Sequence, residues 1–184
     1  VQVLDPSMLL NADDYVELLK DRNEKSFKEK VFQYVLDETE KKTSVVRKVA
    51  ACLGESEADY HSLMPVPFEQ RKDSRLEPLI FNPVEDWIQS FNDADFVVTD
   101  SFHGTVFSIL FQKPFLVILN EKRGGARFRS LLELFALQDR AIANLSDDEV
   151  QRVISTPIDW AAVNEKLKAE RERSLNFLKN VLGK

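Results

Sequence analysis

Two short runs of consecutive apolar residues most constrain the fold, one at 96–98 and the next at 115–119. Consecutive apolar residues in a strand are typical of a parallel sheet that is covered on both faces. A parallel pair of strands needs a crossover between them, and a helix is the usual crossover. We therefore predict a buried helix over 105–111, although its composition also suits a strand, between strands at 95–99 and 115–119.

The same alternation of strand-like and helix-like segments extends along the chain. A strand is predicted at 31–36, a helix that follows it and ends at Gly54, and a short strand near 59–64. Apolar residues between 128 and 135 repeat at the spacing of one helix face. The pattern predicts an α/β fold, a Rossmann-like parallel sheet flanked by helices.

Capping residues mark where several further helices begin. Polar residues at 11–14 favour a short helix, and an asparagine followed by proline at 82–83 favours another. Capping boxes at 146–149 and 156–159 predict two more. The last helix is long, and its apolar face is interrupted near Arg171. We divide the chain into a leader at 1–30, an α/β lobe at 31–156 and a C-terminal helix at 157–184 that packs on the lobe.

Composition excludes several classes of protein. The 184 residues carry a formal net charge of -6, which argues against general nucleic-acid binding by the surface. The single cysteine cannot form an internal disulfide, and two histidines with one cysteine give no recognisable metal-binding spacing. No apolar run approaches the ~20 residues of a membrane span. We expect a cytoplasmic protein without a bound metal.

The turn at 100–104, Asp-Ser-Phe-His-Gly, interrupts the apolar βαβ segment with polar residues. It joins the carboxyl end of a buried strand to the amino end of a buried helix, where open α/β sheets bind ligands and free amides attract anions. Ser101 and Thr105 can donate hydroxyl bonds, Gly104 would let the backbone come close to a ligand, and His103 can move a proton near neutral pH. Alternatively, Ser101 only caps the helix and His103 bonds a nearby carbonyl.

A second polar cluster at 120–129 also follows a strand and precedes a helix. It holds four basic residues against one acidic residue in an otherwise acidic protein. Arginine offers a planar fork that suits carboxylate and phosphate. The candidate binding residues are Asn120, Arg123, Arg127 and Arg129. A merely solvated basic loop is the alternative.

The sequence argues against a serine hydrolase, although an aspartate, a serine and a histidine stand together at 100–103. Residues one and two positions apart do not reproduce the triad geometry, and the sequence has no Gly-x-Ser-x-Gly elbow.

The residues at 94–109, with Lys-Pro-Phe at 113–115 and Arg-Phe at 127–128, resemble the polysaccharide pyruvyl transferase family. Val-Leu-Asp-Pro at 3–6 resembles the end of that family's first half, so the resemblance implies a carboxyl-terminal lobe with a leader from a missing first lobe. It also implies a fold like one lobe of a two-lobed, GT-B-type glycosyltransferase.

The resemblance implies transfer of a pyruvyl group from phosphoenolpyruvate to a sugar of a polysaccharide or glycan precursor, forming a cyclic ketal and releasing phosphate. No cofactor is needed besides this donor substrate, and peripheral association with glycan assembly machinery is compatible with it. His103 would act as general acid or base, or as a phosphate ligand. The helix start would hold one charged group of the donor, and an arginine among 123, 127 and 129 the other. Some relatives have arginine where this chain has Ser101, which removes one cation from the expected site.

Two other functions fit the same pattern of residues. A nucleotide-sugar glycosyltransferase lobe would use the same strand ends to bind a diphosphate. A non-catalytic interaction domain would not depend on His103 at all.

Overall fold

The structure, a computed structural model, describes residues 2–20, 27, 29–56, 60–62, 83–119 and 124–183. Its strands are β1 (Val31–Tyr34), β2 (Tyr60–Ser62), β3 (Phe96–Thr99), β4 (Phe115–Ile118) and β5 (Ala141–Ile142). They form one sheet in the order β2-β1-β3-β4-β5, and every pair is parallel. The predicted Rossmann-like parallel sheet is confirmed.

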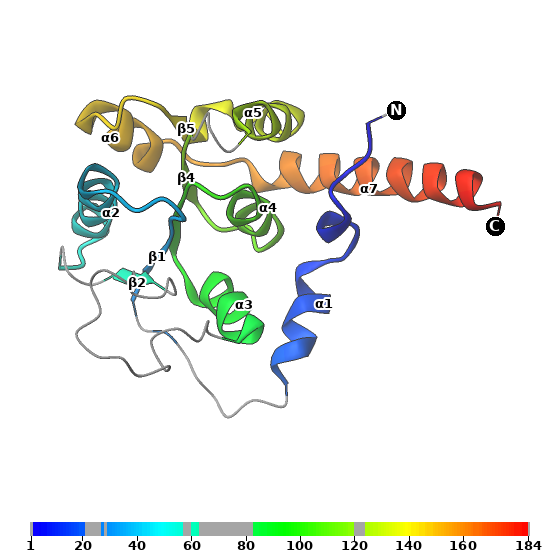
Figure 1. Ribbon diagram of the computed structural model, residues 1–184, viewed down its shortest axis with the longest axis horizontal. Coiled ribbons are helices and arrows are strands. Elements are labelled where there is room, and N and C mark those ends of the chain that lie inside the picture. The colour runs from blue at the N-terminus through cyan, green and yellow to red at the C-terminus, as the bar shows by residue number, and fades with distance from the viewer. Residues whose placement is uncertain are drawn as a thin grey trace.

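Helices cover both faces of the sheet (Figure 1). The described helices are η1 (Pro6–Leu9), α1 (Ala12–Val16), η2 (Glu17–Leu19), α2 (Glu40–Cys52), α3 (Val84–Asp93), α4 (Phe102–Leu110), α5 (Gly125–Leu134), η6 (Gln138–Arg140), α6 (Asp147–Ser155) and α7 (Trp160–Leu182). In Figure 1 α2 and α6 lie on one side of the sheet, and α3, α4 and α5 lie on the other. The helix predicted at 105–111 from the need for a crossover is α4, which begins at Phe102 and ends at Leu110.

The strands alternate their side chains between two apolar cores. Phe32, Val97 and Phe115 pack into the larger core, with α3, α4, α5, α7 and the N-terminal segment. Val98 and Leu116 face the smaller core beneath α2 and α6. Because successive strand residues point to opposite faces, a sheet covered on both sides requires consecutive apolar residues.

The strand order reverses between β1 and β3. The chain passes from β1 outward to β2 and then returns to the other side of β1 to form β3. Ligands of open α/β sheets bind beside the carboxyl ends of the strands at such a reversal. The turn that follows β3 therefore lies at the favoured place for a site.

Hydrogen bonds hold the N-terminal segment on α7. The amide of Leu4 donates to Ser174 Oγ over 3.0 Å, and Arg171 donates to the carbonyls of Met8 and Leu10 over 2.8 and 2.7 Å. Ser174 is fully buried and Glu170 nearly so. The predicted interruption of the apolar face near Arg171 is thus where α7 binds the N-terminal segment, and α7 runs through it without a break.

Two predicted helix starts are wrong in detail. Thr156 closes α6 instead of opening the last helix, whose cap is Asp159, with its side chain accepting from Ala162 N. Pro83 is the cap position of α3 and not its first helical residue, while Asn82 lies outside the described residues. Strand β5 was not predicted. The division at residues 30 and 156 stays a prediction.

Gly104 lets α4 pack closely on β3. A Cβ atom at this position would overlap Thr99 Oγ1 and lie 3.0 Å from Thr99 Cβ. We expect Gly104→Ala to lower the free energy of unfolding by about 1–3 kcal/mol, despite the better helix propensity of alanine. Urea unfolding measures this loss.

The control is the same substitution made together with Thr99→Ala, which removes Oγ1 and Cγ2 from the contact. Adding Gly104→Ala should cost less in that background than in the wild type. Equal costs in both backgrounds would show that the overlap with Thr99 is not the cause.

Candidate functional site

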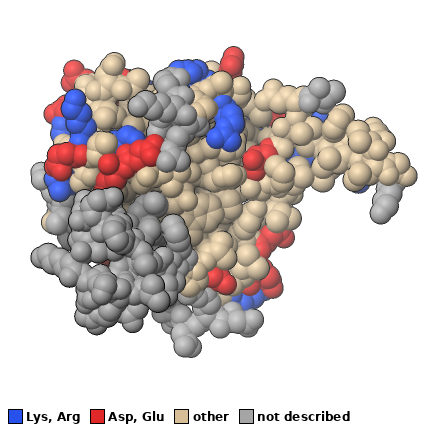
Figure 2. Space-filling view, in the orientation of Figure 1, with Lys and Arg blue, Asp and Glu red and all other residues tan. Residues whose placement is uncertain are grey.

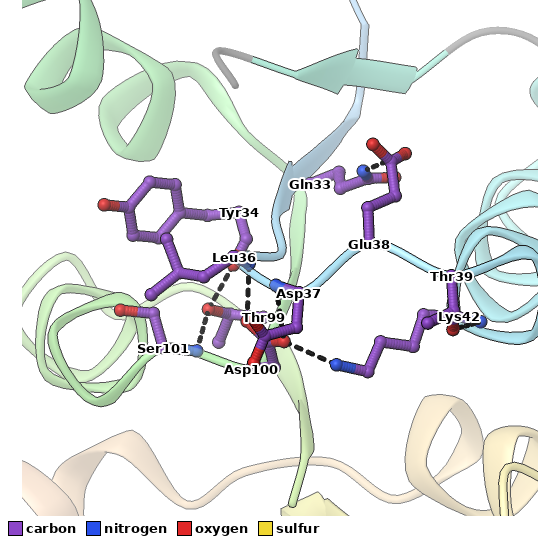
Figure 3. Close-up of polar contacts among 10 residues, drawn as sticks. All are labelled: Gln33, Tyr34, Leu36, Asp37, Glu38, Thr39, Lys42, Thr99, Asp100 and Ser101. Atoms are coloured by element: carbon purple, nitrogen blue, oxygen red, sulfur yellow. Dashed lines mark hydrogen bonds and ion pairs between the residues drawn. The ribbon is translucent and has the colours of Figure 1, made fainter. Parts of the chain in front are cut away.

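Asp100 joins the loops that follow β1 and β3 (Figure 3). Its side chain is fully buried and accepts hydrogen bonds from the amides of Leu36 and Asp37, over 2.6 and 3.2 Å. Lys42 Nζ, on the first turns of α2, lies 2.6 Å from Asp100 Oδ2. One carboxylate therefore binds two backbone groups and one cation, and it fixes how the two strand ends face each other.

Thr99 makes a second connection between the same strands. Its hydroxyl donates to the carbonyl of Tyr34 over 2.6 Å and accepts from the amide of Ser101 over 3.0 Å. The ring of Tyr34 lies on the same side of the loop as Ser101 (Figure 3). Burial raises the pKa of the Tyr34 hydroxyl, and the charge of Asp100 raises that pKa further. Tyr34 is therefore a neutral hydroxyl at physiological pH.

The loop between β1 and α2 has its own polar support. Glu38 accepts from Gln33 Nε2 over 3.0 Å and from the hydroxyl of Thr43 over 3.4 Å. Thr39 caps α2 by accepting from the amide of Lys42. These bonds hold the start of α2, and with it Lys42, beside Asp100.

The first turn of α4 satisfies part of its own hydrogen bonding. Ser101 Oγ accepts from the amide of Gly104 over 3.3 Å, so Ser101 does cap the helix. The hydroxyl of Thr105 donates to the carbonyl of Ser101 and is fully buried. Gly104 serves the contact with Thr99 described above. Ligand binding by these three residues stays a prediction.

Two amides at the same helix start have no bonded acceptor within the described part of the chain, those of Phe102 and His103. The helix dipole adds a partial positive charge at this end. The hydroxyl hydrogen of Ser101 likewise has no acceptor among the described residues. The start of α4 can therefore bind an anion through groups that the fold does not use.

His103 is the titratable group at this helix start. Its side chain is 56% exposed, and its Nε2 lies 3.8 Å from Oδ2 of Asp5, which is 22% exposed. The aspartate comes from the N-terminal segment, far from His103 in the sequence. The imidazole therefore faces both solvent and a carboxylate, and the pair is an ion pair when the imidazole is protonated.

A cavity of about 310 Å³ opens next to these residues. It is lined by residues 2–5, by Phe102 and by side chains of α5: Ala126, Arg127, Ser130, Leu131 and Leu134. The guanidinium of Arg127 lies over the ring of Phe102, with Cζ 5.0 Å from the ring centroid. Three segments that are distant in the sequence thus meet around one cavity that has both apolar and polar lining residues.

The structure brings together only some of the predicted residues. Arg127 joins the first turn of α4 at the cavity, whereas Arg129 is exposed on α5 and is not among the residues that line it. Asn120 and Arg123 lie outside the described residues. Asp5 was not predicted as a site residue, since nothing in the sequence shows that residues 3–6 pack beside α4.

The described part of the chain also holds a second cavity, of about 490 Å³, lined by residues at α1, at the C-terminal end of α4 and on α7. No cluster of three His, Cys, Asp or Glu side chains suited to a metal ion occurs among the described residues. None of the described helices combines the length and the apolar character that crossing a membrane requires. On the face that Figure 2 shows, the coloured Lys and Arg side chains are interspersed with Asp and Glu and do not form one broad basic patch.

The bond between Asp100 and Lys42 has a matched surface counterpart on the same helix. Lys48 pairs with Asp147, whose side chain is 77% exposed, while Asp100 is fully buried. We expect Lys42→Ala to cost about 3 kcal/mol of unfolding free energy, because it leaves a buried carboxylate without its cation. Lys48→Ala should cost about 1 kcal/mol or less. Similar losses for both, measured by urea unfolding, would refute a structural role for the buried pair.

Comparison with models of known protein families matches residues 1–122 of the 184-residue chain to the family described as polysaccharide pyruvyl transferase. The match includes the N-terminal segment with Asp5, both loops joined by Asp100, and all of α4. Comparisons with curated proteins and with solved structures found no match. The chain belongs to the polysaccharide pyruvyl transferase family, a family of transferases that pass a pyruvyl group to a polysaccharide.

Proposed function

We propose that the protein transfers the pyruvyl group of phosphoenolpyruvate to a sugar of a polysaccharide or glycan precursor, forming a cyclic ketal and releasing inorganic phosphate. Family membership supports the transferase reaction. One observation on the structure carries the assignment of the site. An exposed imidazole stands at a helix start with unbonded amides, beside a cavity that an arginine lines.

The reaction needs proton transfer and anion binding, and it balances without a cofactor. A proton is added to the methylene carbon of the enol, and one sugar hydroxyl forms a bond to the neighbouring carbon. A second sugar hydroxyl then forms the other ketal bond to this carbon, and the bond between this carbon and the phosphate oxygen breaks. The two hydroxyls release two protons, of which one balances the new methyl group and one leaves with phosphate. A histidine side chain suits these steps as a proton donor and acceptor, and His103 stands at the proposed donor site.

The donor carries a phosphate and a carboxylate, and the site offers two places for anions. The amides of Phe102 and His103, with the hydroxyl of Ser101, can bind one group at the positive end of α4. Arg127, which lines the cavity, can bind the other as a planar fork. Arg127 would then also provide part of the positive charge that some relatives supply with arginine at the position of Ser101.

The cavity suits the acceptor sugar. Leu131, Leu134 and the ring of Phe102 give it apolar walls, against which the carbon face of a sugar ring can pack. Ser130, which also lines the cavity, offers a hydroxyl for bonds to the sugar hydroxyls. The cavity volume of about 310 Å³ lies at the lower end of the range for small-molecule sites, which fits one ring better than a long glycan.

Further parts of the proposal concern the setting of this chain. The sheet and its helices would correspond to the carboxyl-terminal lobe of a GT-B-type fold, and the acceptor would reach the site in the cytoplasm at peripheral glycan assembly machinery.

A nucleotide-sugar glycosyltransferase would use the same edge of the sheet for a diphosphate. Calorimetry with phosphoenolpyruvate and with nucleotide sugars separates the two.

His103→Gln tests the proposed chemistry. Glutamine keeps a hydrogen-bonding side chain but cannot transfer a proton, so phosphate release from phosphoenolpyruvate in the presence of acceptor glycans should fall on the order of 10²–10⁴-fold. His61→Gln, at the only other histidine, is the control and should retain activity. Full activity in His103→Gln would remove His103 from the reaction. If the wild type shows no turnover and His103→Gln binds phosphoenolpyruvate and glycans as the wild type does, a non-catalytic interaction domain is favoured.

A further inference from the structure

We propose that Asp5 is a positioning residue of this site, which holds the imidazole of His103 toward the cavity and keeps it paired when it carries a proton. This inference rests on the proposed function for its role in the reaction. The pairing itself can be tested without that function. It gives a specific role to one residue of the N-terminal segment, which lines the cavity.

The two carboxylate oxygens of Asp5 have different partners. Oδ1 accepts from the amide of Ser7 over 3.0 Å and so caps η1, while Oδ2 lies 3.8 Å from Nε2 of His103. The bond to Ser7 fixes the rotamer of the Asp5 side chain, and in this rotamer Oδ2 faces His103. A side chain already held by its surroundings loses less conformational entropy when it acts on a neighbour.

The backbone on both sides of Asp5 is also held. Leu4 and Met8 are buried in the larger core. The amide of Leu4 is bonded to Ser174, and the carbonyls of Gln2 and Met8 accept from Arg173 and Arg171, over 2.7 and 2.8 Å.

The α7 side chains that hold this segment are themselves fixed. Ser174 Oγ donates to the carbonyl of Glu170 over 2.8 Å, and Arg173 bonds the carboxylate of Glu170. The hydrogen bonds of Arg173 and Lys166 hold the pKa of Glu170 below its usual range, against the effect of burial. Helix α7 therefore sets the position of Asp5 relative to α4.

A carboxylate is unexpected beside an anion-binding site, because it repels the ligand. Asp5 also lines the cavity with Phe102 and Arg127, where its charge opposes the binding of an anionic donor. A pairing with His103 explains why Asp5 stands there. An imidazole that gives and takes protons must keep one orientation and must be stabilised while charged. In this role Asp5 orients the imidazole, and the protons move between His103, the enol carbon and the sugar hydroxyls.

The kinetic test uses Asp5→Asn, Asp5→Glu and the exposed control Asp13→Asn. Asparagine retains Oδ1 for the amide of Ser7, so the N-terminal segment should keep its fold, which urea unfolding checks. For Asp5→Asn we expect kcat for phosphate release to fall on the order of 10-fold to 10²-fold, less than for His103→Gln. The KM for phosphoenolpyruvate should stay the same or fall, since a negative charge has gone. Asp5→Glu should recover part of kcat.

A double-mutant cycle with His103→Gln shows whether Asp5 acts through His103. Asp5→Asn should have no further effect on kcat once His103 is replaced. The inference would be overturned if Asp5→Asn lowered kcat by the same factor in the wild type and in His103→Gln. It would also be overturned if Asp5→Asn alone kept the kcat of the wild type.

A chemical readout separates the inference from the proposed function. Diethyl pyrocarbonate modifies histidine at an accessible ring nitrogen, and mass spectrometry distinguishes His103 from His61. Loss of the carboxylate beside Nε2 should make modification of His103 several-fold faster in Asp5→Asn than in the wild type or Asp13→Asn. Should the wild type release no phosphate with any acceptor, the proposed function fails, and this rate alone decides the pairing: a faster rate supports it and an equal rate overturns it.

Discussion

The buried carboxylate of Asp100 is the interaction on which the rest of the site depends. It joins the amides after β1, the cation of Lys42 on α2 and the turn after β3 in one set of bonds. A buried charge is costly unless it is fully paired, so this arrangement has little freedom to rearrange. The first turn of α4, which carries His103, therefore starts from a fixed point at the reversal of strand order.

Around this fixed point the site is assembled from segments that are far apart in the sequence. The start of α4 supplies His103 and its unbonded amides, α5 supplies Arg127, and the N-terminal segment supplies Asp5. Helix α7 takes no part in the cavity wall but holds the N-terminal segment in place. Loss of α7 should therefore disturb the chemistry as well as the stability.

Local patterns predicted most of the fold, because consecutive apolar strands and the need for a crossover leave few arrangements. They also predicted the candidate turn at 100–104, including the alternative in which Ser101 caps α4. They missed β5, which has only two residues, and they mistook Thr156 for the N-terminal cap of the last helix because Asp159 lies inside the same motif. Asp5 could not be found this way, since its contact with His103 depends on how the N-terminal segment packs against α4 and α7.

In the proposed reaction the start of α4 binds the anionic donor. Titration of the ¹⁵N-labelled protein with phosphoenolpyruvate, followed by backbone amide shifts, measures this binding residue by residue. We expect saturable shifts at Phe102 and His103 and at the first turn of α5 near Arg127, with α2 and α6 unchanged. No saturable shift at the start of α4, or a response confined to another part of the sheet, would contradict this expectation.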